Sequence, residues 1–278
     1  MALQVPQADW GRWSPWGRFW AMRRDYDAVV ERLITAAERD AGLGERDDVL
    51  ALMLQSRHGD GSGLSHGEIA DELLTLLTAG HETTATTLAW AVERLRRHAA
   101  VLRELAEEAD AGGTAFREAT ILEVQRTRPV IDMMPRQVKA GSLRLGPWTL
   151  PKGCVVLVSI CLIHDDESVF PNAPGFEPSR FLGAKPHLYQ WIPFGGGARR
   201  CPGAAFATME MNVVLRTMLR EFSLAPTSER DERWHSRGIT NAPAKGGLAI
   251  VRRRATRAVP PVAATAAGAR STGAPAAS

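Results

Sequence analysis

The sequence has few cysteines and no long apolar run. Three cysteines among 278 residues do not form a closed set of disulfides, and none belongs to a C-x-x-C pair of the kind that binds zinc. We therefore expect a reducing, cytoplasmic setting. No stretch of about 20 apolar residues occurs, so we predict no membrane span. The first 20 residues also lack the apolar core of a signal peptide.

The sequence also has little net charge and no phosphate-binding loop. A net charge of +3 is too small to predict a nucleic-acid partner. No Gly-Lys-Ser/Thr occurs, and the single glycine cluster fails G-x-G-x-x-G at its last position, where Arg200 stands. The glycine cluster therefore needs an explanation other than nucleotide binding.

That cluster surrounds one cysteine, Cys201, in the segment Phe194–Gly203, just before an apolar helical pattern. A helix N-terminus and neighbouring guanidinium groups stabilise a negatively charged sulfur. Glycines let the backbone curl tightly and lie against a flat group. A thiolate presented in this way suits one strong bond to a transition metal such as haem iron. The alternative is a buried, inert cysteine in a turn.

The spacing F-x-x-G-x-R-x-C-x-G resembles the haem-ligand loop of the cytochrome P450 monooxygenases. In this sequence it is occupied by Phe194, Gly197, Arg199, Cys201 and Gly203. The resemblance implies that haem b is the cofactor, that Cys201 ligates its iron, and that Arg199 pairs with a haem propionate. Phe194 and Gly203 would shape the same binding loop.

A long helix is predicted upstream. Ser65 and Glu68 form a capping box, and apolar residues follow at helical intervals with no proline or C-cap glycine before Arg97. This predicts one helix of roughly 32 residues, about 48 Å long at 1.5 Å per residue. Such a helix usually crosses the middle of a larger body.

The middle of this helix carries an acid and an alcohol, Glu82 and Thr83. Gly80 and the nearby threonines weaken helical preference, and threonine hydroxyls bond back to carbonyls, so we expect a locally opened helix. The pair suits proton delivery to a bound oxygen species. The segment is similar to the oxygen-activating A/G-G-x-D/E-T-T/S motif of the same family, which implies a catalytic role. The alternative is a solvated glutamate beside helix-tolerated threonines.

Two further patterns match the family. Glu123 and Arg126 resemble its Glu-x-x-Arg helix, whose pair is joined by a later arginine, here Arg180; Ser179 replaces the acid usual before it. The resemblance implies a network that holds the cysteine loop. Arg136, beyond that helix, stands where the family places a propionate-binding arginine. The alternatives are a surface ion pair and solvated arginines.

The remaining pattern predicts a mainly α fold with a small β part. Residues 143–145, 154–158 and 248–251 are predicted as strands, and residues 252–278, rich in Ala, Pro, Thr, Ser and Gly, as a disordered tail. We interpret residues 1–251 as a partial, truncated cytochrome P450 domain whose amino-terminal part is absent. A chain of this kind would leave apolar faces uncovered and is expected to be inactive alone.

The resemblance implies a haem-dependent monooxygenase that inserts one atom of O₂ into an apolar small molecule. Its electrons would come from a ferredoxin-type donor and an NAD(P)H-dependent reductase. Two alternatives stay open at this stage. One is a non-catalytic remnant or interaction module, and the other is a thiolate-haem sensor without oxygenation.

Overall fold

The computed structural model describes residues 11–184 and 186–254. Its helices are α1 (Pro15–Glu38), α2 (Val49–Gln55), α3 (His66–Arg97), α4 (Ala99–Ala111), α5 (Ala115–Thr127), α6 (Ile160–His164) and α7 (Ala204–Glu221). Short 3₁₀ turns are η1 (Gly11–Trp13), η2 (Leu43–Glu45), η3 (Pro178–Phe181) and η4 (Gly197–Arg199).

The β part consists of antiparallel pairs. The strands are β1 (Met133–Gln137), β2 (Ser142–Leu145), β3 (Trp148–Pro151), β4 (Val155–Ser159), β5 (Phe222–Leu224), β6 (Trp234–Arg237), β7 (Thr240–Pro243) and β8 (Val251–Arg253). They pair as β1–β4, β2–β3, β5–β8 and β6–β7. The predicted mainly α class with a small β part is confirmed.

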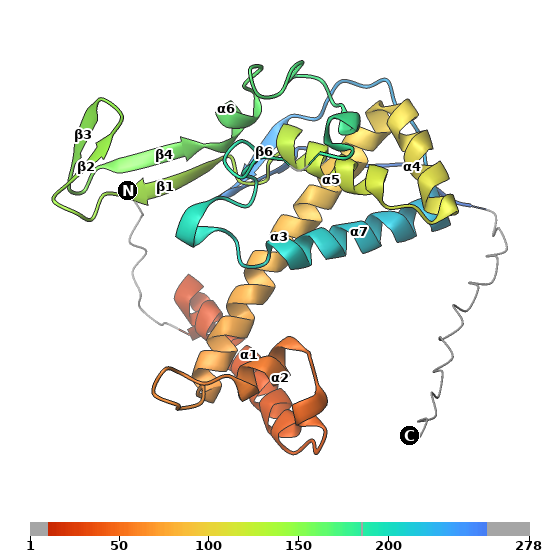
Figure 1. The fold of residues 1–278 in the computed structure, drawn as a ribbon. Coiled ribbons are helices and arrows are strands. Elements are labelled where there is room, and N and C mark those ends of the chain that lie inside the picture. The colour runs from red at the N-terminus through yellow and green to blue at the C-terminus, as the bar shows by residue number, and fades with distance from the viewer. Residues whose placement is uncertain (1–10, 185, 255–278) are drawn as a thin grey trace, which may run out of the picture.

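Helix α3 organises the molecule. It is 32 residues long, as predicted, and its capping box is formed: the Ser65 hydroxyl accepts from the Glu68 backbone N–H, and the Glu68 carboxylate accepts from the Ser65 N–H at 2.8 Å. Figure 1 shows α3 running from a small lobe, made with α1 and α2, into a larger body that contains α4, α5 and α7. The chain therefore has two packing regions along one helix.

Each region has its own apolar core. In the small lobe, Val30 and Ile34 of α1 pack against Ile69 and Ala70 of α3. In the body, α3 meets α4, α5 and α7 around a larger cluster. Its fully or nearly fully buried members include Trp90, Leu95, Leu105, Val124, Met211, Leu215 and Leu219. The amphipathic spacing of these helices places one apolar face of each in this cluster.

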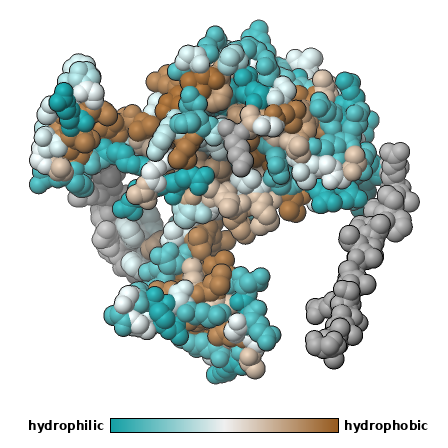
Figure 2. All heavy atoms as spheres, in the orientation of Figure 1, coloured by the Kyte–Doolittle hydropathy of each residue, from teal (hydrophilic) through white to brown (hydrophobic). Residues whose placement is uncertain are grey.

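Between the two cores, α3 is bare. Residues 75–82 are all exposed, and eight consecutive positions span more than two turns, so every side of the helix is uncovered there. Leu76 and Leu77 are 42% and 60% exposed. Figure 2 shows apolar side chains on the part of α3 between the lobe and the body. This surface is more apolar than the helix ends.

The structure corrects the predicted start of the disordered tail, because residues 252–254 are ordered. Arg252 and Arg253 lie in β8, paired with β5, and the Arg254 guanidinium lies 2.6 Å from Asp110 of α4. These backbone and charge contacts hold residues 252–254 in place although their sequence is strongly polar. The remainder of the tail, from residue 255 on, lies outside the described residues. Within the described ranges, no helix is both long and apolar enough to cross a membrane.

Candidate functional site

The cysteine loop joins the main core to α7. Cys201 lies three residues before α7 begins, and its backbone N–H donates to the Phe194 carbonyl at 2.9 Å, which closes the loop. Gly195 and Gly197 have φ values of +72° and +65°, a region that favours glycine. Phe194 packs against the core. The glycines therefore provide the tight curl that the sequence predicts, next to a helix N-terminus.

The three thiols differ in their surroundings. Burial, reinforced by Asp132 and Asp165, raises the pKa of Cys161 to about 11, so this thiol stays protonated at neutral pH. Cys154 is half-buried, whereas Cys201 is exposed. The structure therefore does not place Cys201 as a buried, inert cysteine, and its sulfur is available to a metal.

Arg136 lies beside the same loop. A Cβ atom added at Gly195 would lie 2.8 Å from the Met134 sulfur, and the Arg136 guanidinium approaches that sulfur at 4.0 Å. Strand β1 therefore packs directly against the cysteine loop. Among the described residues, neither Arg136 nor Arg199 has a carboxylate within 4.0 Å. These two guanidinium groups have no carboxylate partner among the described residues, and an exposed thiol lies in the adjoining loop. The combination fits a group that carries both a metal and carboxylates. Haem is such a group.

The Glu-x-x-Arg residues form a buried network. Arg126 donates through Nε and Nη2 to the two carboxylate oxygens of Glu123, both at 2.8 Å. Arg180 Nε donates to Glu123 Oε1 at 3.2 Å, and the Glu177 backbone N–H donates to the same oxygen at 2.8 Å. Glu123 and Arg126 are 0% and 1% exposed, so the surface-pair alternative is excluded. The structure brings the three sequence-predicted residues together and ties α5 to η3.

A buried histidine extends this network toward the cysteine loop. His164 is 0% exposed; its Nδ1 lies 3.1 Å from the Arg126 carbonyl, and its Nε2 lies 3.0 Å from the Ile192 nitrogen. Burial lowers the pKa of His164 to about 4, so the neutral ring donates from Nδ1 and accepts at Nε2. Trp191 also donates to the Leu122 carbonyl of α5 at 3.1 Å. These bonds fix the chain just before Phe194 against the Glu-x-x-Arg helix.

Sequence reasoning missed His164, because a histidine followed by two aspartates looks like part of a polar surface loop. The only signal lay in its position after the apolar run of β4 and α6, which predicts burial of the element that carries it.

Glu82 and Thr83 lie in an unbroken helix, so the expectation of a locally opened helix is wrong. The Thr83 hydroxyl donates to the Ala79 carbonyl at 2.7 Å, and the Thr87 hydroxyl donates to the Thr83 carbonyl at 3.0 Å. These bonds add to the backbone ladder and do not replace it. Glu82 Oε1 accepts from the Thr240 hydroxyl at 3.0 Å. In the described chain, neither Glu82 nor Thr83 hydrogen-bonds to the cysteine loop.

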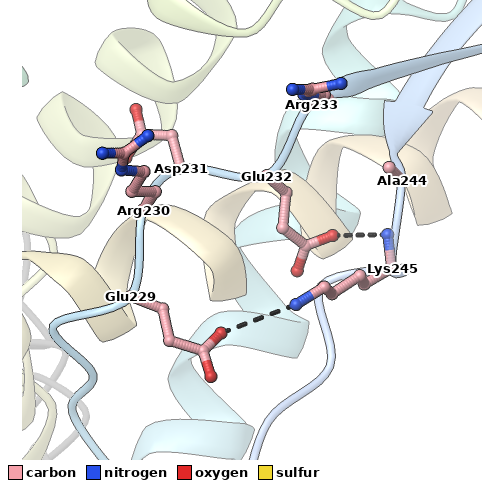
Figure 3. A pocket seen from close by; sticks show the side chains of 7 residues that line it. All are labelled: Glu229, Arg230, Asp231, Glu232, Arg233, Ala244 and Lys245. Carbon is pink, nitrogen blue, oxygen red and sulfur yellow. Dashed lines mark hydrogen bonds and ion pairs between the residues drawn. The ribbon is translucent and has the colours of Figure 1, made fainter.

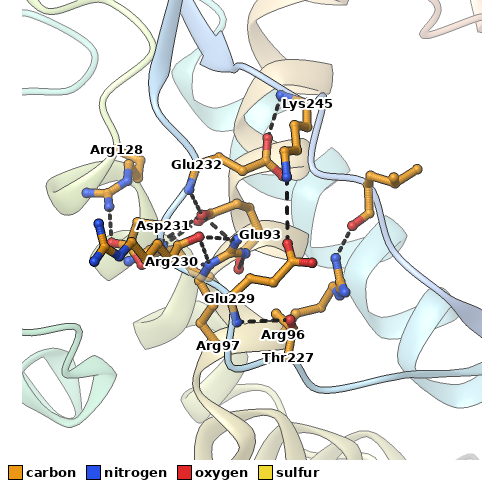
Figure 4. Close-up of polar contacts among 12 residues, drawn as sticks. Glu93, Arg96, Arg97, Arg128, Thr227, Glu229, Arg230, Asp231, Glu232 and Lys245 are labelled. Carbon is orange, nitrogen blue, oxygen red and sulfur yellow. Dashed lines mark hydrogen bonds and ion pairs between the residues drawn. The ribbon is translucent and has the colours of Figure 1, made fainter.

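A second charge network lies at the far end of α3 and was not predicted. Glu93 is 0% exposed and accepts from Arg94 and from the Glu232 backbone N–H, the latter at 2.8 Å. Asp231 pairs with Arg94 at 2.7 Å and with Arg128 at 2.8 Å. Figure 4 shows Glu93, Arg128, Asp231 and Glu232 of this network close together.

Pairing shifts the pKa values of Arg94 and Asp231 toward their charged forms, whereas burial and the neighbouring Arg94 charge lower the pKa of Arg128. Burial lowers the pKa of Arg94, but hydrogen bonds to Glu93 and Asp231 outweigh burial, so its pKa lies above its ordinary value. The hydrogen bond from Arg94 is the main reason that the pKa of Asp231 is lowered. Arg94 and Asp231 are therefore both charged at neutral pH.

A cavity of about 400 Å³ borders this network. Figure 3 shows its lining, which consists of Glu229, Arg230, Asp231, Glu232, Arg233, Ala244 and Lys245. Lys245 Nζ lies 3.7 Å from the Glu229 carboxylate, and the Lys245 backbone N–H donates to Glu232 at 2.6 Å. Glu229 and Lys245 pair with each other, Asp231 pairs with arginines outside the lining, and we assign no ligand to the cavity.

Comparison with known proteins agrees with the geometry. The family described as Cytochrome P450 matches residues 8–249. The chain is 54% identical over 253 residues to "Putative cytochrome P450 138" of Mycobacterium tuberculosis, covering 91% of this chain and 57% of that protein. It is 42% identical over 233 residues to "Putative cytochrome P450 137" of the same organism, covering 82% of this chain and 49% of that protein. The chain therefore spans about half the length of these relatives.

Solved structures show the same fold. A crystal structure of a cytochrome P450 (CYP102L1) superposes with a TM-score of 0.74 at 28% identity, over 90% of this chain and 60% of that one. Retinoic acid-bound cyanobacterial CYP120A1 superposes with a TM-score of 0.74 at 24% identity, over 86% of this chain and 58% of that one. On the extent of the family match and the identity to these relatives, the chain belongs to the cytochrome P450 family, whose cofactor is haem b.

Proposed function

We propose that this chain carries the haem-binding and proton-handling part of a haem-dependent monooxygenase. In the overall reaction, a substrate C–H group, O₂, two electrons and two protons give C–OH and water. The observation that carries the proposal is the exposed Cys201 in its glycine loop, flanked by two arginines without an internal carboxylate partner. Bound haem b would supply the iron at which O₂ is reduced.

The residues around the loop would hold that group. The Cys201 sulfur is the proposed iron ligand, and the Arg136 and Arg199 guanidiniums are the proposed partners of its carboxylates. Phe194 and Gly203 flank the ligand: Phe194 anchors the loop to the core, and a Cβ added at Gly203 would lie 3.9 Å from the Cys201 sulfur. That distance is an ordinary van der Waals contact, so residue 203 lies directly beside the ligand atom.

Glu82 and Thr83 are the proposed proton-handling pair. A carboxyl group can take up and release a proton, and a threonine hydroxyl can pass one on. Thr83 holds its hydroxyl proton on the Ala79 carbonyl, and Glu82 lies against Thr240. Glu82 is exposed and Thr83 is half-exposed in the middle of α3, so both are accessible to water.

The electron donor, the substrate class and the location belong to the same proposal. The electrons would come from a ferredoxin-type protein and its NAD(P)H-dependent reductase, and the substrate would be an apolar small molecule. Three unpaired cysteines are compatible with the reducing cytoplasm that we propose as the location. The buried Glu123–Arg126–Arg180 network would act by fixing the cysteine loop and would take no part in the chemistry.

The test is a reduced-CO difference spectrum of the chain reconstituted with haem. We expect a thiolate-type band in the parent protein, loss of that band in Cys201→Ser, and retention in the matched control Cys154→Ser. An unchanged band in Cys201→Ser overturns the ligand assignment. A parent protein that takes up no haem supports the remnant alternative. One that binds haem and CO but never turns over, even when restored with an upstream segment, supports the sensor alternative.

The role of Thr83 is tested separately. In a chain restored with an upstream segment, Thr83→Ala should keep the thiolate-type spectrum but form less product per NAD(P)H consumed, with the missing electrons recovered as hydrogen peroxide. Thr83→Ser, which keeps the hydroxyl, should restore the parent ratio. If Thr83→Ala forms product with the parent ratio, the proton-handling role of Thr83 is wrong.

A further inference from the structure

The β6–β7 hairpin is fixed at both of its ends by the buried charge network. Just before β6, the Glu232 backbone N–H donates to the fully buried Glu93 at 2.8 Å. Just after β7, the Lys245 backbone N–H donates to the Glu232 carboxylate at 2.6 Å. Figure 4 shows both contacts, and Figure 3 shows the second one from close by. The base of the hairpin is therefore held to the helix that also carries Glu82.

Strand β7 lies directly on α3. Trp90 Nε1 donates to the Asn241 carbonyl at 2.8 Å, and the Asn241 N–H donates to the Val130 carbonyl at 2.8 Å. Beyond the strand, a Cβ added at Gly247 would lie 2.5 Å from the Ala89 carbonyl oxygen, so the backbone touches the helix there. These contacts leave β7 little freedom to slide along α3.

Thr240, the first residue of β7, reaches Glu82 across this contact. It is 3% exposed, and its hydroxyl lies 3.0 Å from Glu82 Oε1 and 3.5 Å from the Arg237 carbonyl oxygen. A hydroxyl has one proton to donate and also accepts, whereas a carboxylate only accepts. Thr240 therefore donates to ionised Glu82. When Glu82 carries a proton, Thr240 accepts from it and can turn its own proton toward Arg237.

We propose that Thr240 is a positioning residue for Glu82, which it holds in both protonation states against the β6–β7 hairpin. The inference rests on the proposed proton-handling role of Glu82. It adds that the hairpin, through one buried hydroxyl, sets where the acid points. A movement of the hairpin would then move the acid with it.

The contact is tested by a double-mutant cycle in chemical unfolding of the chain. We expect the effects of Thr240→Val and Glu82→Ala on the folding equilibrium constant to be non-additive. The factor by which the double variant lowers this constant should be about five- to tenfold smaller than the product of the two single-variant factors. Thr240→Ser should restore the coupling. The matched control is Thr120→Val, another buried threonine, which should be additive with Glu82→Ala. Additivity of Thr240→Val with Glu82→Ala within twofold overturns the proposal.

The role is tested in the haem-loaded chain, restored with an upstream segment and supplied with its redox partner. Thr240→Val should lower kcat several-fold with KM unchanged and divert electrons to peroxide, and Thr240→Ser should recover the parent values. A loss confined to KM, or a Thr240→Ser variant as poor as Thr240→Val, overturns the positioning role. Failure of the proposed function itself shows up earlier and separately, as absence of the Cys201-dependent spectrum, and the unfolding cycle still decides whether Thr240 holds Glu82.

Discussion

His164 Nε2 accepts a hydrogen bond from the Ile192 backbone N–H at 3.0 Å and thereby holds the chain that leads into the cysteine loop. The bond requires a neutral ring. Because burial lowers the pKa of His164 to about 4, the folded state keeps the ring neutral down to that pH. An unfolded chain protonates the same ring near its ordinary value of 6.5.

This difference predicts a pH-dependent stability. Above pH 6.5 both states are neutral and the histidine adds no pH dependence. As pH falls from 6.5 to about 4, only the unfolded state takes up the proton, so stability should fall by about 3 kcal/mol and then level off.

The measurement is urea unfolding of the parent and of His164→Gln between pH 7 and 4. Gln keeps an acceptor for Ile192 but does not titrate, so the difference between the two curves isolates His164. This comparison is needed because pairing with Glu31 and Glu38 raises the pKa of His66, which gives the opposite dependence: stability that is lost as pH rises. Parallel curves for the two proteins would refute the assignment.

The Glu123 network predicts a large and local cost of substitution. Glu123→Ala would leave Arg126 buried without its acid, and removal of one partner of a buried pair costs about 3–5 kcal/mol. Glu118 lies on the same helix but is exposed, so Glu118→Ala should change stability by less than about 0.5 kcal/mol. The free energies of unfolding of the two variants decide this. If both variants lose the same free energy of unfolding, the buried network adds no stability beyond that of an ordinary position on α5.

The sequence predicted the parts of this fold that depend on local signals. Helix α3 was predicted from a capping box and an uninterrupted apolar pattern, and the cysteine loop from the identity of its residues at fixed spacing. Both depend on residues close together in the chain. The pairing of Glu123 with Arg180 spans 57 positions and was predicted only through resemblance to a family.

Contacts that depend on how distant segments pack were not predicted. Nothing local marks His164 as buried, or connects Glu93 with Glu232 across 139 positions. The intact helix at Thr83 was also missed, because weak helical preference is overridden when a hydroxyl bonds back to the preceding turn without displacing the backbone bond.

The second charge network leads to a further stability prediction. Glu93→Ala would remove the acid that accepts from Arg94 and from the Glu232 N–H, and we expect a loss of about 3–5 kcal/mol. Glu72, on the same helix but exposed, is the matched control, and Glu72→Ala should be nearly neutral. Thermal and urea unfolding would measure both. A loss below about 1 kcal/mol for Glu93→Ala would mean that the arginines find water or other acids instead.

The exposed stretch of α3, residues 75–82, leads to a prediction about dye binding and solubility. Substitutions there should change both without changing stability. Leu76 and Leu77 are 42% and 60% exposed and belong to a run of exposed positions on all sides of the helix. An apolar surface of this kind binds hydrophobic dyes and promotes association. Substitution of both leucines by Gln should lower dye fluorescence and raise the soluble yield. Because little apolar area is buried there, the free energy of unfolding should stay within about 0.5 kcal/mol of the parent.

Thr75→Gln, in the same exposed stretch, controls for the added amide and should leave dye binding unchanged. A loss of more than about 1 kcal/mol in the leucine variant would show that these side chains pack against the rest of the chain in solution, contrary to their exposure.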